Sequence, residues 1–270
     1  MEKIENIKEE LLKRDLFLFD LDGTVYIGDK EIEGAFSAIE YLRSIGKKIC
    51  FLTNNSSRSL EDYLIKLKKM GFTTSKEEMF SSGMATAEYI SLNYPKKSVF
   101  VLGTSALMYE FYKAEIPIDE EEPDIVVLGF DTNLMYDRLY KACRFLRDRK
   151  LYIATHPDIN CPNPQGPMPD IGAIMKLLEA SVERVPDVIC GKPYAPMAES
   201  IQRHFSISAD KIAMIGDRLY TDIRFGNDNG FLSILVMSGE TTEEMLLNKT
   251  FVPDIKLSAV SEIERILKEN

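Results

Sequence analysis

The chain has 270 residues, which is enough for one large core together with a sizeable insertion or a second domain. Hydrophobic residues make up 45% and charged residues 28% of the sequence, a composition that excludes a disordered chain. The formal charge of −10 argues against nucleic acid or an anionic membrane as partners, although one divalent cation and one lysine can reverse the field locally.

The cysteines and the apolar runs indicate the cellular setting. Cys50, Cys143, Cys161 and Cys190 are widely spaced and contain no C-x-x-C pair, so neither a disulfide framework nor a zinc site is expected. The longest apolar run falls well short of the roughly 18 residues of a membrane span. The first residues are charged where a signal peptide would be apolar. We therefore expect a cytoplasmic protein.

Short apolar runs alternate with segments of helical periodicity along nearly the whole chain. The predicted strands are residues 16–19, 48–52, 99–102, 125–128, 151–154, 188–189, 212–215 and 233–237. A helical stripe between the second and third of them consists of Leu60, Tyr63, Leu64, Leu67 and Met70, with Gly71 placed to end the helix. A second stripe covers 198–205. This alternation predicts an α/β fold with a parallel sheet and helices on both of its faces.

The segment 158–170 interrupts this rhythm. It contains four prolines and a glycine, so it can form neither a helix nor a central strand. It reads as an ordinary surface loop or as a functional one, because loops of this length in compact domains are usually either functional or disordered. A loop that faces the substrate is therefore one of two expectations.

Two carboxylates follow the first predicted strand. Side chains alternate along a strand, so Asp20 and Asp22 point roughly the same way, and Gly23 gives the chain room to turn. The carboxyl ends of parallel strands border the ligand crevice. Two like charges there need a cation or a shared proton to offset their repulsion. The pattern predicts either a catalytic pair or a simple turn at the end of a strand.

Three more predicted strands end in polar groups. Thr53 follows the second strand, Lys192 lies in a Gly-Lys-Pro turn after 188–189, and Asp217 follows 212–215 with Asp222 five residues later. Each of these residues also has a non-catalytic interpretation, since a lysine is usually a surface charge and Asp217 can cap a helix. Four apolar strands that end in complementary groups favour one common site.

In this order, these residues resemble the four motifs of the haloacid dehalogenase superfamily. The residues around these motifs are similar to those of its NagD-like, 4-nitrophenyl phosphatase group. The similar segments are Leu52-Thr-Asn-Asn-Ser56, Ala154-Thr-His-Pro-Asp158, Gly191-Lys-Pro193 and Gly216-Asp-Arg-Leu-Tyr-Thr-Asp222. The resemblance spans nearly the whole chain, apart from about the first dozen residues.

The resemblance implies an architecture. Asn55 and Gly191 are 136 positions apart, far more than neighbouring core strands require, and in this group the interval holds an α/β cap domain. The expected fold is a Rossmann-like parallel-sheet core (haloacid dehalogenase fold) formed by 1–83 and 187–270, with an inserted α/β cap domain at 84–186. The segment 158–170 then belongs to the cap and faces the core site.

The resemblance also implies a phosphatase mechanism. Asp20 attacks phosphorus and becomes an aspartyl phosphate, while Asp22 protonates the leaving alkoxide and then takes a proton from the hydrolytic water. Mg²⁺ fits the hard oxygen ligands that the motifs supply, namely the carboxylates of Asp20 and Asp217 and the backbone carbonyl of Asp22. Thr53 binds phosphoryl oxygens, and Lys192 neutralises charge on the nucleophile and the phosphate.

Further residues have supporting roles in this expectation. Gly23 and the Asn54 amide bind the phosphate, and Asp222 holds Lys192 or a metal-bound water. The candidates for substrate contact are Asn55, Arg58, His156, Asp158 and Asp170.

The predicted partner is a small phosphorylated metabolite. Within the same chemistry, a phosphotransferase or mutase would pass the phosphoryl group to a sugar hydroxyl instead of water. A receiver-like signalling module also uses an acidic cluster with a Lys-Pro, but its motif order differs and its domain is much shorter. The sequence leaves open the physiological substrate and whether chains pair through the cap, as occurs in the family.

Overall fold

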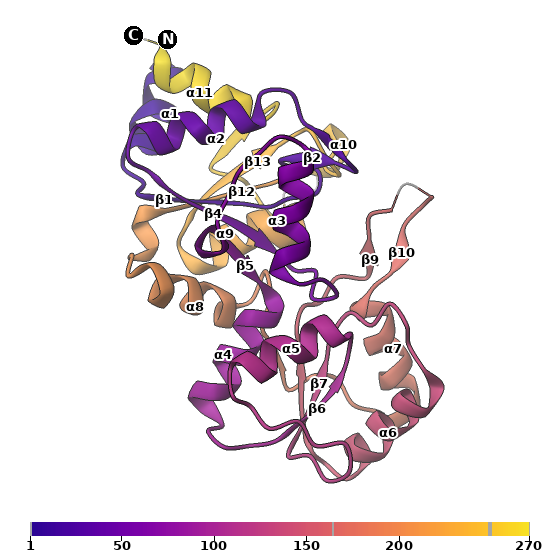
Figure 1. Cartoon of the computed structure of the whole chain (residues 1–270). Helices are drawn as coiled ribbons and strands as arrows, with labels where there is room; N and C mark the ends of the chain where they lie inside the picture. Colours follow the sequence, from indigo (N-terminus) through magenta and orange to yellow (C-terminus); the bar gives the residue numbers. More distant parts are fainter. Residues whose placement is uncertain (1, 164, 248–249, 270) are drawn as a thin grey trace. The chain divides into compact units, whose positions relative to one another are not determined.

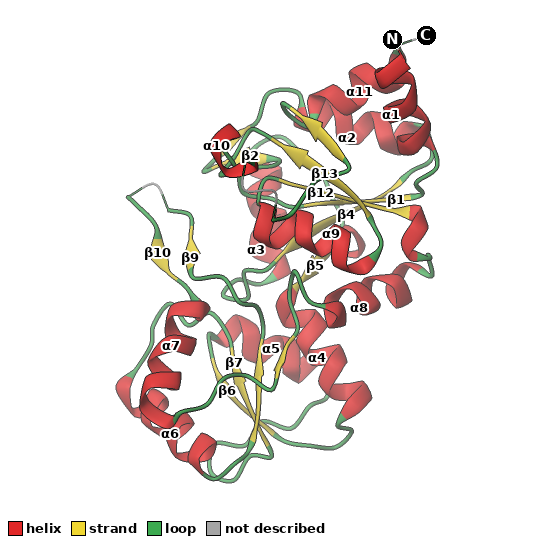
Figure 2. Ribbon diagram, turned by 180° about the vertical axis from the view of Figure 1, so that it is seen from behind, coloured by secondary structure: helices red, strands yellow, loops and turns green. Residues whose placement is uncertain are grey.

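The computed structural model describes residues 2–163, 165–247 and 250–269, and the chain divides into two compact units, each built on its own sheet. The first unit is formed from Met1–Leu52, Leu64–Phe80 and Ile201–Asn270. The second unit is formed from Thr53–Tyr63 and Ser81–Ser200. Figures 1 and 2 show the two sheets with their helices.

The second unit is longer than the interval predicted for a cap. Besides 84–186 it takes in Thr53–Tyr63 and the stretch that follows residue 186 up to Ser200. The last strand of its sheet lies in that stretch, which ties the Gly191-Lys192 turn to this unit. The boundaries of a core domain at 1–83 and 187–270 and a cap at 84–186 stay a prediction.

The first unit is organised by a six-stranded sheet with the order β14-β13-β12-β1-β4-β5. Pairing is parallel from β14 through to β4. Phe19, the last residue of β1, is level with Ile215 of β12 and Phe51 of β4. The strands are β1 (Leu16–Phe19), β4 (Lys48–Thr53), β5 (Met79–Ser81), β12 (Ile212–Gly216), β13 (Leu232–Val236) and β14 (Ile255–Leu257), and a small antiparallel pair consists of β2 (Tyr26–Ile27) and β3 (Lys30–Glu31).

Helices of the first unit pack against this sheet and against each other. The last helix, α11 (Ser261–Lys268), contacts both α1 (Glu2–Leu12) and α2 (Ala35–Ser44), so the first and last described elements lie side by side (Figure 1). The remaining helices that contribute to this unit are α3 (Leu60–Lys69), α8 (Ala195–Phe205), α9 (Arg224–Asn229) and α10 (Glu243–Leu246). Gly71, with φ of +88°, follows the end of α3 as the sequence predicts.

The second unit contains a four-stranded parallel sheet with the order β11-β8-β7-β6. Its strands are β6 (Val99–Leu102), β7 (Ile125–Leu128), β8 (Leu151–Ala154) and β11 (Val188–Ile189). Its helices are α4 (Ser82–Asn93), α5 (Ser105–Lys113), α6 (Tyr136–Arg147) and α7 (Ile171–Val182).

Alternation along β6 explains why this sheet needs continuous apolar runs. Phe100 and Leu102 pack in one cluster with side chains of α6 and α7, whereas Val99 and Val101 pack in another with side chains of α4 and α5. Successive strand residues point to opposite faces, so a sheet covered by helices on both sides requires an apolar residue at every position. The mixed α/β class and the parallel sheet predicted from the sequence are confirmed.

The proline-rich segment 158–170 forms neither a helix nor a central strand. Its two ends pair as a short antiparallel ladder between β9 (Asn160–Cys161) and β10 (Met168–Pro169), which Figure 2 shows as a projecting hairpin. One of the four prolines, Pro164, lies outside the described residues. Asp170 then caps α7, since its side chain accepts the Ile171 N–H at 2.6 Å.

All eight predicted strands are present, with ends that differ by at most one residue. Within residues 2–163, 165–247 and 250–269, six further short strands of two or three residues were not predicted from the sequence. In the part of the chain that the structure describes, no helix has the length and apolar character needed to cross a membrane.

Replacing Leu18 in the middle of β1 tests the buried sheet of the first unit. Leu18 is 0% exposed and lies level with Met214 and Cys50 on the neighbouring strands. Leu18→Ala removes buried apolar surface and leaves a cavity, so the free energy of unfolding in urea should fall by about 2–5 kcal/mol. Leu247→Ala, at a side chain that is 77% exposed, should change it by less than about 0.5 kcal/mol. Equal losses would contradict the burial assigned to β1.

Candidate active site

Three carboxylates meet at one end of the sheet of the first unit. Asp20 directly follows β1 and donates its backbone N–H to Ile215 at 2.9 Å, Asp217 directly follows β12, and Asp222 comes one turn later. One carboxylate oxygen from each lies within 4.8 Å of the others. Asp217 and Asp222 are buried, and Asp20 is partly exposed. The parallel register predicted that Asp20 and Asp217 would meet, because the carboxyl ends of neighbouring strands lie at the same edge; Asp222 was predicted only in a supporting role.

Backbone packs tightly around Asp217. A Cβ atom at Gly239 would stand 1.9 Å from its Oδ2, and one at Gly23, where φ is +90°, would stand 2.4 Å from the same oxygen. The Glu240 N–H donates to Oδ2 at 2.7 Å. Both glycines are therefore required, because any side chain at either position would displace the carboxylate.

Asp222 is placed by a short π-helical turn, Leu219–Ile223. Its side chain packs directly on Gly216, where a Cβ atom would come within 2.3 Å of the carboxyl group. The Arg218 N–H donates to Oδ2 of Asp222 at 3.2 Å. The five-residue spacing between Asp217 and Asp222 thus brings the second carboxylate back against the end of β12.

The electrostatics of this group call for a cation. Burial, reinforced by the nearby charge of Asp222, raises the pKa of Asp217 to about 7. A divalent cation bound by Asp20, Asp217 and Asp222 would offset this cost, and hard carboxylate oxygens are the donors that Mg²⁺ prefers. The residues present therefore fit a magnesium site. Asp222, which was predicted only to support the site, lies near enough to be a ligand itself.

Asp22 is not one of the three clustered carboxylates, and it contacts Lys66 and Tyr26. Its side chain is 47% exposed, with the Lys66 ammonium 3.8 Å from Oδ1. The Tyr26 hydroxyl donates to Oδ2 at 3.4 Å, and the Lys66 ammonium also lies 3.8 Å from the centre of the Tyr26 ring. Lys66 and Tyr26 were missed in the sequence, because nothing in the spacing distinguishes Lys66 from the other lysines at the end of α3.

The predicted phosphate-binding residues after β4 belong to the second unit. Thr53 is the last residue of β4 and is buried, and its hydroxyl accepts the Asn55 N–H at 3.1 Å. The Asn55 side-chain oxygen accepts the Ser57 N–H at 2.9 Å and its hydroxyl at 2.7 Å. Arg58 is exposed. These bonds fold residues 53–57 into a compact turn of backbone and hydroxyl groups.

Lys192 is held in the same unit. It follows β11 and is only 1% exposed. Its backbone N–H donates to the Asn54 side-chain oxygen at 2.8 Å, and its carbonyl accepts from the Asn54 side-chain nitrogen at 3.0 Å. A contact between these two residues, 138 positions apart, was not evident from the sequence.

His156, Asp158 and Asp170 form a second buried group, in which one ligand-type atom of each lies within 4.8 Å of the others. His156 is 0% exposed, with Nδ1 3.0 Å from the Thr155 hydroxyl and Nε2 3.1 Å from Asp170 Oδ1. Asp158 accepts from the Asn54 side-chain nitrogen at 3.2 Å. The structure brings these three predicted residues together, and the contacts described here are with protein atoms. Their substrate contacts stay predictions.

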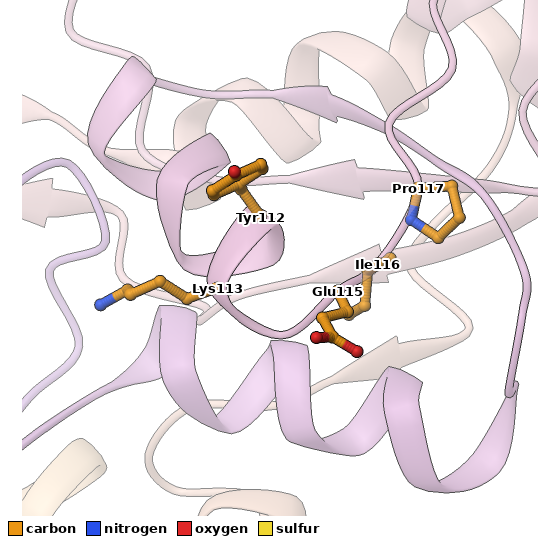
Figure 3. A pocket seen from close by; sticks show the side chains of 5 residues that line it. All are labelled: Tyr112, Lys113, Glu115, Ile116 and Pro117. Atoms are coloured by element: carbon orange, nitrogen blue, oxygen red, sulfur yellow. The ribbon is translucent and has the colours of Figure 1, made fainter.

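A separate hollow in the second unit contains none of the predicted site residues. It has a volume of about 420 Å³ and is lined by the end of α5 and the turn after it (Figure 3). Tyr112, Lys113 and Glu115 contribute its polar groups, and Tyr112 is 73% exposed. Nothing in this lining resembles a catalytic set, so the carboxylate clusters remain the candidate site.

Comparison with known proteins finds the same family twice along the chain. Residues 17–117 match the model of a haloacid dehalogenase-like hydrolase, and residues 189–263 match a second model described as haloacid dehalogenase hydrolase-like. The two matches include Asp20, Thr53, Lys192 and Asp217. An acid sugar phosphatase from Staphylococcus haemolyticus is 34% identical over 254 residues, covering 92% of this chain and 96% of that protein.

Solved structures of phosphatases are also similar to this chain over nearly its whole length. The crystal structure of a 4-nitrophenylphosphatase from Thermotoga maritima is 44% identical, with a TM-score of 0.93, and the match covers 96% of this chain and 99% of that one. A glycerol phosphate phosphatase from Mycobacterium tuberculosis, solved in complex with magnesium, is 26% identical with a TM-score of 0.88, and the match covers 94% of this chain and 77% of that one.

The carboxylate cluster of the first unit should bind a divalent cation in solution. Magnesium should raise the midpoint of thermal unfolding of the wild-type protein, because a ligand at about 100 times its Kd stabilises the folded state by about 2.7 kcal/mol. Asp217→Asn removes one anionic ligand and should largely abolish this shift. Asp124→Asn, at a partly exposed carboxylate of the second unit that pairs with Lys97, serves as the control and should keep it. An equal shift in wild type and Asp217→Asn would contradict the assignment.

Proposed function

Because this chain belongs to the haloacid dehalogenase-like hydrolases, in the group of NagD-like and 4-nitrophenyl phosphatases, and is a phosphoric monoester hydrolase, we propose that it hydrolyses small phosphate monoesters through a phosphorylated Asp20 with Mg²⁺ as cofactor. The family resemblance noted in the sequence is confirmed. The observation that supports the mechanism is the meeting of Asp20, Asp217 and Asp222 at the end of β1 and β12.

Asp20 is the proposed nucleophile, because it is the most exposed member of that cluster and follows β1 directly. One of its carboxylate oxygens attacks phosphorus, and the bond from phosphorus to the leaving oxygen breaks. The leaving alkoxide takes a proton from Asp22. Water, which gives a proton back to Asp22, then attacks phosphorus and breaks the bond to Asp20. Inorganic phosphate leaves, and both aspartates return to their starting state.

Magnesium would be held by Asp20 and Asp217 together with the backbone carbonyl of Asp22, and Asp222 lies near enough to take part. When bound, the ion supplies positive charge that stabilises the phosphoryl oxygens and lets an anionic nucleophile approach an anionic substrate. The buried, mutually repelling carboxylates support this role, because without a cation they are costly to keep ionised.

The surroundings of Asp22 suit its change of role. The Lys66 ammonium 3.8 Å away favours the carboxylate, which is the form that accepts a proton from water in the second step. Tyr26 and Lys66 thus hold Asp22 in position for both steps.

Thr53 and Lys192 complete the proposal. Their positions in the family motifs assign Thr53 and the Asn54 backbone amide to phosphoryl oxygens and Lys192 to the charge on phosphate and nucleophile. Lys192 is 1% exposed, and the turn that carries it is fixed by hydrogen bonds between its backbone and the Asn54 side chain. Gly23 leaves space beside Asp217, which supports its assignment near the phosphate.

The proposed substrates are small phosphorylated metabolites, sugar phosphates among them. Support comes from the acid sugar phosphatase and the 4-nitrophenylphosphatase that resemble this chain over nearly its whole length. Transfer of the phosphoryl group to a sugar hydroxyl instead of water would use the same intermediate, and no observation favours it.

A phosphate-release screen over a panel of phosphorylated metabolites, with and without magnesium, tests the proposal. Asp20→Asn should abolish release while leaving the far-UV circular dichroism spectrum intact, because the amide is isosteric but not nucleophilic. The variant serves as the blank for every substrate. Most of the activity surviving in Asp20→Asn would rule out the aspartyl-phosphate mechanism.

The role of Asp22 predicts a dependence on the leaving group. Asp22→Ala should lower kcat by about 10²–10⁴-fold for alkyl phosphates, whose leaving alkoxide needs a proton. The first step should suffer less with 4-nitrophenyl phosphate, because 4-nitrophenolate leaves without protonation. Single-turnover measurement of 4-nitrophenolate release isolates that step. Equal losses with both kinds of substrate in that measurement would contradict a role as general acid.

A further inference from the structure

The side chain of Asn54 brackets the backbone of Lys192. Its oxygen accepts the Lys192 N–H at 2.8 Å, and its nitrogen donates to the Lys192 carbonyl at 3.0 Å. One carboxamide therefore occupies both backbone groups of one residue, much as a neighbouring strand would. Asn54 and Lys192 are 6% and 1% exposed, so both bonds are shielded from water.

The sequence around Lys192 is shaped for this contact. A Cβ atom at Gly191 would lie 2.7 Å from the Asn54 side-chain oxygen and 2.6 Å from the Thr155 carbonyl. The Gly191 N–H also donates to that carbonyl at 2.7 Å. Glycine is needed at 191 because the carboxamide of Asn54 and the end of β8 both approach the backbone there.

Asp158 fixes which way the Asn54 carboxamide faces. The nitrogen of the amide makes a second hydrogen bond, to Asp158 Oδ2 at 3.2 Å. Both partners of this nitrogen are pure acceptors, and the partner of the oxygen is a donor, so only one orientation of the amide satisfies all three bonds. Asp158 is 7% exposed and faces this network from the segment after β8.

Asp158 is itself held in place from both sides of its segment. Its carbonyl accepts the Gly172 N–H at 2.8 Å in the first turn of α7. Two residues before it, His156 bridges the Thr155 hydroxyl and the Asp170 carboxylate. The segment that presents Asp158 is therefore anchored to the end of β8 and to the start of α7.

We propose that Asn54 and Asp158 are positioning residues for Lys192: Asp158 orients the Asn54 carboxamide, and the carboxamide fixes the backbone from which the Lys192 ammonium is presented to the phosphoryl group. The inference rests on the proposed function, in which Lys192 carries charge to the reaction. It gives Asp158 a role in positioning Lys192, in place of the substrate contact that was expected from the sequence.

The chemistry of the network favours this assignment. A residue that selects substrates must offer a polar atom to the ligand, whereas Asp158 lies 93% buried and accepts from a buried amide. To orient the Asn54 carboxamide, Asp158 needs only an acceptor oxygen opposite the Asn54 side-chain nitrogen, and it does not need a negative charge. A displacement of about 1 Å in a group that stabilises the reacting phosphate can cost about 10²-fold in rate, so the fixed backbone has a direct effect on kcat.

The test compares two variants at one position. Asp158→Ala removes the acceptor, and kcat should fall by about tenfold to a hundredfold with KM little changed. Asp158→Asn keeps an acceptor oxygen and loses the charge, so it should recover most of the lost activity. The fold-change in kcat should be the same for 4-nitrophenyl phosphate and for a sugar phosphate, because the reacting phosphoryl group is common to both.

Asp187→Ala is the matched control. The Asp187 carboxylate is also a hydrogen-bond acceptor, in its case from the Tyr152 backbone N–H at 2.8 Å, but it lies before β11, at the opposite end from Lys192. This variant should lower the unfolding midpoint and leave kcat unchanged at a temperature where the protein is folded. Asn54→Asp removes both amide hydrogens and should lower kcat as Asp158→Ala does. The two variants are independent tests, so the proposal can still be tested if one of them folds poorly.

A double-mutant cycle separates positioning from general stability. In a Lys192→Ala background the ammonium is absent, so Asp158→Ala should cost little further activity. The same additional cost with and without Lys192 would overturn the proposal. So would equal loss in Asp158→Asn and Asp158→Ala, which would mean that the charge itself acts, or a loss confined to KM or to one substrate, which would mean direct substrate contact.

The two levels of inference fail differently. If the wild-type protein releases no phosphate from any monoester, the proposed function fails and the role of Asp158 falls with it. If the wild type is active and Asp20→Asn is not, but Asp158→Ala retains full kcat, the function stands and only the positioning role is lost.

Discussion

The repulsion among buried carboxylates at the end of β1 and β12 is the constraint on which the rest of the structure depends. Asp20, Asp217 and Asp222 lie within 4.8 Å of one another, two of them buried. Such a group is stable only with a cation or with protons to offset it. The same condition makes the site useful, because a bound cation then holds positive charge next to a carboxylate that can attack an anionic phosphate.

A second polar arrangement follows the same topological rule with different chemistry. In the second unit, β8 and β11 are parallel neighbours, and the polar residues that follow them include His156, Asp158 and Lys192. Here hydrogen bonds to the Asn54 carboxamide connect Asp158 with the backbone of Lys192. Parallel strands gather polar residues at one edge in both units, and the side chains present decide whether the result is an ion site or a hydrogen-bonded clamp.

The glycines of the motifs serve close approach more than flexibility. Gly216 leaves room for the carboxyl group of Asp222, and Gly239 leaves room for that of Asp217. Gly191 does the same for the carboxamide of Asn54. Only at Gly23, with φ of +90°, does the backbone conformation add a second reason. In a motif such as Gly-Asp-x-x-x-x-Asp, the glycine is therefore needed because the second aspartate packs against it.

The sequence by itself determined the eight strands that are built on uninterrupted apolar runs, and the carboxylates that follow β1 and β12, because alternation and parallel register are local rules. The short β14 was missed, since Lys256 interrupts its apolar residues. Only the tertiary structure decided which polar groups touch. Asn54 and Asp158 are 104 positions apart, and Lys66 reaches Asp22, in the turn after β1, from α3. Such contacts depend on how elements pack, and no spacing along the chain encodes that.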